Sequence, residues 1–302
     1  MVNLPVQHIS APGKMEPFVP DPDQRKRIEM GSSADIRMCW TCGSCDAQCP
    51  VNIATGRLRP QKIVRIANLG FLDELLHMPE IWYCLTCRRC MQVCPNAVSP
   101  STLIDYARRK ALFKGVVSLD LFRRHANLFK RFQQVRWHTV RHCLSGELGG
   151  FDQQKWGRWQ RQPDEPGSST ISLPSFNQVT PEYRDMIRDS RTQACFTCGE
   201  CSSACPIACG RSAFDPRALF RLVNLGMLDE LIRSPSIWLC IECGRCTQSC
   251  SQQVDGRQII KAIKEFAIQT GQIDMEFHLR LEKANRLVFG HYLKEIDLLF
   301  NY

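Results

Sequence analysis

Residues 39–50 read CWTCGSCDAQCP, a run in which four cysteines follow the spacing C-x2-C-x2-C-x3-C and a proline comes next. The same design returns as CLTCRRCMQVCP at 84–95, CFTCGECSSACP at 195–206 and CIECGRCTQSCS at 240–251, where serine replaces the proline. These runs hold all but two of the 18 cysteines. Iron–sulfur clusters are bound by soft thiolate sulfur, and this spacing is typical of [4Fe–4S] ligation.

The four runs predict four [4Fe–4S] clusters, because in paired runs the fourth cysteine ligates the neighbouring cluster. Structural zinc, held by paired C-x2-C elements, is the competing metal, and colour and metal content distinguish the two. The predicted ligand sets are Cys39, Cys42, Cys45 and Cys94 (cluster 1); Cys84, Cys87, Cys90 and Cys49 (cluster 2); Cys195, Cys198, Cys201 and Cys250 (cluster 3); and Cys240, Cys243, Cys246 and Cys205 (cluster 4).

The second pair of runs repeats the first pair 156 residues further along the chain, without insertion or deletion. The match continues between the runs. NLGFLDEL at 68–75 returns as NLGMLDEL at 224–231, and the pattern P-x-I-W precedes both Cys84 and Cys240. The sequence therefore predicts a tandem duplication with two domains.

The local pattern predicts helices. Apolar positions recur at helical spacing after Pro60 and Pro216, and Gly70 and Gly226 stand where a glycine would end each helix. No convincing period-two alternation with hairpin turns is visible, so we expect an all-α fold. The predicted division is an extended N-terminal arm at 1–22, a first module at 23–144, a linker rich in Gly, Pro and Ser at 145–180, and a second module at 181–302.

The first module ends in a basic amphipathic segment at 119–142, with an apolar stripe at Leu121, Leu128, Phe132 and Val135. Packing of this segment on its own module is the first expectation, and docking on an acidic partner protein or a membrane surface is the alternative. The formal charge of +9 does not indicate nucleic-acid binding. Four clusters with about −2 each would leave the loaded protein near roughly +1.

The chain has no run of ~18 apolar residues and no apolar signal region near its start. We therefore expect a cytoplasmic protein, in contact with a membrane only peripherally or through partners. Cys143 is expected to be a free thiol and Cys209 a small buried side chain. Trp82 and Trp238, two residues before a ligand cysteine, are expected to pack in the core beside a cluster.

Paired cysteine runs joined by N-L-G-x-L-D-E-L and P-x-I-W resemble the C subunit of heterodisulfide reductase and its relatives, over about residues 23–118 and 181–273. The resemblance implies two tandem α-helical ferredoxin modules, each with two [4Fe–4S] clusters. It also implies that the chain passes electrons from a flavin-bearing A subunit to a catalytic B subunit with C-C-G motifs, or in the reverse direction. This chain has no adjacent cysteines, so we expect no catalytic residues of its own. The alternatives are an iron–sulfur subunit of a quinone-linked respiratory oxidoreductase, and a zinc or redox-sensing scaffold.

Overall fold

The computed structural model describes residues 19–146, 156–158, 187–208 and 214–302, and no β-strand occurs within these ranges. The predicted all-α fold is confirmed. The helices of the first half are α1 (Pro22–Ser32), η1 (Ile36–Met38), α2 (Ser44–Ala47), α3 (Pro50–Thr55), α4 (Pro60–Asn68), α5 (Leu72–His77), α6 (Glu80–Tyr83), α7 (Arg89–Gln92), α8 (Pro100–Phe113) and α9 (Leu119–Leu144). Those of the second half are η3 (Thr192–Ala194), α12 (Glu200–Ala204), α13 (Pro216–Asn224), α14 (Leu228–Arg233), α15 (Pro235–Leu239), α16 (Arg245–Gln248), α17 (Gly256–Gln269) and α18 (Met275–Phe300).

The ends of α4 and α1 show why the short helices stop where they do. Pro60 occupies the first turn of α4, where its missing N–H costs nothing. Gly70 follows the end of α4 with φ +80°, and a Cβ on it would lie 2.0 Å from the carbonyl oxygen of Asp21. Asp21 also caps α1, because its carboxylate accepts from the backbone N–H groups of Asp23 and Gln24. Only glycine allows the start of α1 to approach α4 this closely.

The duplication extends beyond the cysteine runs into the long helices. α17 begins 156 residues after α8, and α18 begins 156 residues after α9, with equal lengths in each pair. The two halves therefore share their long helices as well as their cysteine runs, although residues 206–208, which match the start of α3 (Pro50–Thr55), are not helical.

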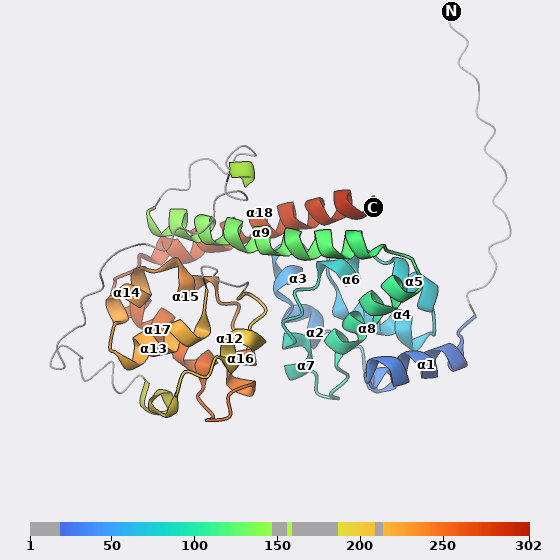
Figure 1. The fold of residues 1–302 in the computed structure, drawn as a ribbon, viewed down its shortest axis with the longest axis horizontal. Coiled ribbons are helices and arrows are strands. Elements are labelled where there is room, and N and C mark those ends of the chain that lie inside the picture. The colour runs from blue at the N-terminus through green and yellow to red at the C-terminus, as the bar shows by residue number, and fades with distance from the viewer. Residues whose placement is uncertain (1–18, 147–155, 159–186, 209–213) are drawn as a thin grey trace, which may run out of the picture.

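The two long helices lie side by side along one edge of the molecule, with a cysteine-bearing module beneath each end (Figure 1). α9 leaves the first module and contacts α15 of the second, while α18 leaves the second module and contacts α3 and α6 of the first. Each module is therefore covered partly by its own long helix and partly by that of the other half.

The basic segment packs on both modules, which corrects the first expectation from the sequence. Leu128, Phe132 and Val135 lie in the core of the first module, but Val140 and Cys143 lie in the core of the second. The periodicity identified the buried stripe of the helix and could not identify what covers it, because a 26-residue helix extends past the module from which it starts.

Parts of the predicted arm and linker lie outside the described residues, as does Cys209. Within the predicted linker, residues 156–158 are helical, and the ring of Trp156 lies 4.4 Å from that of His291 in α18. The boundaries of the two modules stay predictions. In the part of the chain that is described, no helix is long and apolar enough to cross a membrane.

Candidate metal centres

All four cysteine runs adopt the same unusual backbone. The residue before the second cysteine and the residue after it both have positive φ, which turns the chain sharply around that cysteine. Such consecutive turns point backbone N–H groups into a concave site, an arrangement found at many iron–sulfur centres. The residues are Thr41 and Gly43, Thr86 and Arg88, Thr197 and Gly199, and Glu242 and Gly244.

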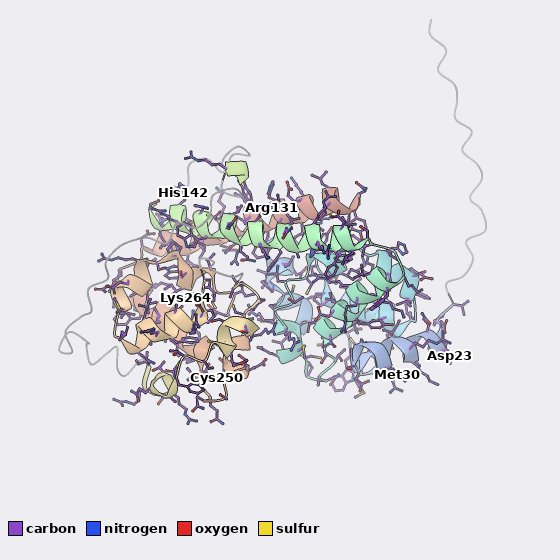
Figure 2. The ribbon with its side chains drawn as sticks, viewed as in Figure 1. Asp23, Met30, Arg131, His142, Cys250 and Lys264 are labelled. Atoms are coloured by element: carbon purple, nitrogen blue, oxygen red, sulfur yellow. The ribbon has the colours of Figure 1, made fainter. Side chains whose placement is uncertain are left out.

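Two of the predicted ligand sets line cavities. Cys39, Cys42, Cys45 and Cys94 line a small cavity in the first module. Cys195, Cys198, Cys201 and Cys250 line a similar small cavity in the second module, which Cys246 also borders. Figure 2 shows Cys250 on the lower side of that module, remote from the long helices. Cys42 and Cys198 are exposed, so we call these the outer sites.

The other two predicted sets lie deeper, and we call them the inner sites. Burial, followed by the neighbouring thiolates of Cys84, Cys87 and Cys49, raises the pKa of Cys90. In the second module, burial, followed by the thiolates of Cys240, Cys243 and Cys205, raises the pKa of Cys246. The fourth cysteine of the outer run thus lies beside the inner set in each module, as crossed ligation requires.

Burial makes the inner thiols poor acids unless a metal replaces their protons. It raises the pKa values of Cys49, Cys87 and Cys205 to about 12, well above that of an exposed thiol. Iron binds thiolate, so loading the sites would release these protons and place several negative charges in the interior. The structure must supply positive charge to balance them.

Matching cations lie beneath the inner cysteine loops. Arg108 donates to the carbonyl oxygens of Ile81 at 2.7 Å and Cys84 at 2.6 Å. Lys264, which follows it by 156 residues, donates to the carbonyl oxygen of Cys240 at 3.1 Å. Each cation opposes the rise that burial causes in the pKa of the neighbouring cysteine. Figure 2 shows Lys264 within the second module.

A further cation, Arg136, reaches the second inner site from α9. Its side chain is 3% exposed and donates to the carbonyl oxygen of Leu239 at 3.0 Å, directly before Cys240. Burial lowers the pKa of Arg136 to about 10, and the thiolates of Cys240 and Cys205 oppose that change. None of these cations was predicted from the sequence. The 156-residue offset between Arg108 and Lys264 could have identified these two as a repeated pair of cations. No such signal existed for Arg136, because the residue 156 positions later is a tyrosine, Tyr292.

The donors fit [4Fe–4S] clusters. Each predicted set has four soft sulfur ligands, and backbone N–H groups of Thr86, Val98 and Glu242 donate to cysteine sulfur at 3.3 Å each. Such hydrogen bonds stabilise the thiolate form. Among the described residues, no three His, Cys, Asp or Glu side chains converge so closely that they could hold one metal ion. A four-iron cluster has a different requirement, because each thiolate binds its own iron.

Two predictions about neighbouring residues are confirmed. Trp82 is fully buried and stacks on Phe300 at 4.5 Å, and Trp238 is 5% exposed and packs edge-on against Phe277. Both therefore fill the core beside an inner run. Cys143 is also fully buried, in the second core, and burial raises its pKa to about 11.

Comparison with known proteins identifies the two modules. Residues 34–98 and 191–254 each match the model of the 4Fe-4S dicluster domain. These two tandem regions are thus similar to 4Fe–4S dicluster domains, and together with their cysteine runs they indicate [4Fe–4S] clusters.

The curated relatives are components of heterodisulfide reductases. The chain is 31% identical over 101 residues to the C subunit of the H(2):CoB-CoM heterodisulfide,ferredoxin reductase of Methanothermobacter thermautotrophicus, which is 32% of this chain and 52% of the relative. It is 37% identical over 97 residues to the iron-sulfur C 2 subunit of the CoB--CoM heterodisulfide reductase of Methanocaldococcus jannaschii, 32% of this chain and 50% of the relative. The chain spans about half the length of these relatives. The predicted resemblance to the C subunit of heterodisulfide reductase is confirmed.

Proposed function

We propose that this chain is an electron-transfer subunit that holds four [4Fe–4S] clusters and relays electrons between the flavin-bearing and the catalytic subunits of a heterodisulfide-reductase-like complex. Each cluster supplies one-electron chemistry through a valence change of its iron. The observation that carries the proposal is the fourfold repetition of one cysteine loop, with positive φ at the same two positions of each loop.

The proposed ligands are the four crossed sets predicted from the sequence. Their assignment is supported by the two outer cavities, which bring Cys94 to the first run and Cys250 to the third. It is also supported by the proximity of Cys49 to the second run and of Cys205 to the fourth. The residues of the chain hold the sulfur ligands, exclude water from the inner sites and balance their charge.

The partners of the proposed complex follow from the relatives, each of which is named as the C subunit of a reductase. A protein with C-C-G motifs, similar to the B subunit, would carry out the disulfide or thiol chemistry, since this chain has no adjacent cysteines. Anaerobic co-purification with that protein and with a flavoprotein similar to the A subunit is the expected result. Co-purification with an integral-membrane quinone oxidoreductase instead would contradict this choice of complex.

We predict that Cys42→Ala and Cys198→Ala each remove one outer cluster, because each takes one thiolate from a four-sulfur site. Iron content should fall from about sixteen to about twelve atoms per chain in either variant, and to about eight in the double variant. Iron analysis of anaerobically purified protein is the measurement. Cys143→Ala, which changes a cysteine outside the runs, is the control and should keep its iron. Full iron content in both outer-site variants would contradict the ligand sets.

A further inference from the structure

The inner cysteine loops of the two modules meet at a junction inside the chain. Arg89 of α7 donates to the carbonyl oxygen of Ile241 at 3.1 Å, and Arg245 of α16 donates to that of Thr86 at 3.3 Å. The two arginines stand 156 residues apart, so the junction is nearly symmetric. Figure 1 shows α7 and α16 facing each other across the boundary between the modules.

A third contact across the junction involves a predicted ligand residue, Cys243. The Gln92 side chain donates to the backbone carbonyl oxygen of Cys243 at 2.5 Å. A Cβ on the next residue, Gly244, would lie 3.4 Å from that same side chain. Cys87 and Cys243, the second cysteines of the inner runs, are both buried.

The outer runs have the opposite environment. Trp40, which follows the first cysteine of its run, is 72% exposed, and its counterpart Phe196 is 60% exposed. The corresponding residue of the second run, Leu85, is 3% exposed at the junction. In each module, therefore, the outer cysteine loop faces solvent and the inner cysteine loop faces the other module.

We propose that electrons pass between the two modules within this chain, at the junction where Arg89 and Arg245 hold the inner cysteine loops together. This inference rests on the proposed function. In this step one electron would leave a cluster held by the run at 84–90 and enter one held by the run at 240–246, so the first would be oxidised and the second reduced. No bond changes and no proton is transferred.

The physical reason is distance. Electron tunnelling falls steeply with separation, so the two sites that approach each other most closely carry the transfer between the modules. Arg89 and Arg245 are positioning residues, because they bind backbone carbonyls and not the ligand sulfurs. The whole chain then forms one electron-transfer path with an outer site at each end, instead of two modules that each transfer electrons to a separate partner.

The test compares two double variants of the full chain after complete reduction. Cys42→Ser with Cys198→Ser leaves the inner clusters, and Cys87→Ser with Cys243→Ser leaves the outer clusters. The electron paramagnetic resonance spectrum should show splitting from spin–spin interaction between modules in the first variant, and that splitting should be lost in the second. Unsplit spectra in a fully loaded first variant would overturn the inference. Iron content measured on the same samples separates this outcome from failure of the proposed function, in which no clusters would be present.

A second variant keeps every cysteine. In Arg89→Glu with Arg245→Glu, two carboxylates replace the arginines that bind carbonyl oxygens in wild type. Because a carboxylate and a carbonyl oxygen repel each other, the junction should open. The fully reduced variant should keep its iron and lose the inter-module part of the splitting that wild type shows. Arg65→Glu with Arg221→Glu, at exposed side chains of α4 and α13 that also stand 156 residues apart, is the matched charge control. A spectrum of the double variant identical to that of wild type would also overturn the inference.

Discussion

Arg136 is a charged side chain that is 3% exposed and binds neutral groups, the backbone carbonyl oxygen of Leu239 and the side-chain amide oxygen of Gln133. A buried cation of this kind is costly unless negative charge lies nearby. Cys240 and Cys205 provide that charge once they are thiolates. Arg136 is thus a residue of α9 whose positive charge lies at the inner site of the second module.

This placement predicts an effect on reduction potential. Arg136→Gln removes a positive charge that favours the reduced, more negative cluster, so the potential of the second inner cluster should fall. An interaction on the order of 1 kcal/mol corresponds to about 40 mV for a one-electron couple. Potentiometric titration followed by paramagnetic resonance measures the shift. Arg136→Lys, which keeps the charge, should restore most of the potential, and Arg131→Gln on the exposed face of α9 should leave it unchanged. A potential that does not move in Arg136→Gln would contradict the charge-balancing role.

The ligand residues could be predicted from the sequence, but the balancing cations could not. Cysteine spacing is a local property, and it predicts that Cys49 joins the ligand set of the run at 84–94, an assignment that stays a prediction. Arg136 donates to the carbonyl oxygen of Leu239, next to Cys240, although it lies more than one hundred positions earlier in the chain. Only tertiary packing brings the two residues together. A basic residue on an amphipathic helix is ordinarily solvated, so nothing local distinguished Arg136 from Arg131.

At the scale of elements, α9 and α18 bind the modules together. Phe132 of α9 stacks on Tyr292 of α18 at 4.1 Å and packs edge-on against Phe289 at 5.1 Å. At the far end of α18, Asp297 binds Arg57 and Tyr83 of the first module. The apolar stripe of α9 was visible in the sequence, but its partner helix was not, because periodicity marks the buried face and says nothing of what covers it.

We predict that Phe132→Ala destabilises the protein by about 3 to 5 kcal/mol, since it removes a buried aromatic ring and leaves a cavity between the two helices. Unfolding in denaturant, followed by far-ultraviolet circular dichroism under anaerobic conditions, measures the change. Phe113→Ala, at a side chain that is 85% exposed, is the control and should stay within about 0.5 kcal/mol of wild type. Equal stability of the two variants would show that the contact between α9 and α18 does not hold the modules together.

At the scale of the whole molecule, the chain resembles a dimer whose halves are covalently joined. The 156-residue repeat predicted two copies of one module. The structure adds that the long helix of each copy also packs on the other copy, and that the copies meet through their inner cysteine loops (Figure 1). The arrangement was not predictable from the repeat, because each half encodes the same local structure whether or not it contacts the other. The proposed electron path requires four cluster sites within one chain.

The most direct test of the four-cluster assignment is the iron and acid-labile sulfide content of the anaerobically purified full chain. We predict a brown protein with about sixteen iron and about sixteen sulfide per chain, whose visible absorption bleaches reversibly on reduction. A colourless protein with stoichiometric zinc and no labile sulfide would contradict the assignment.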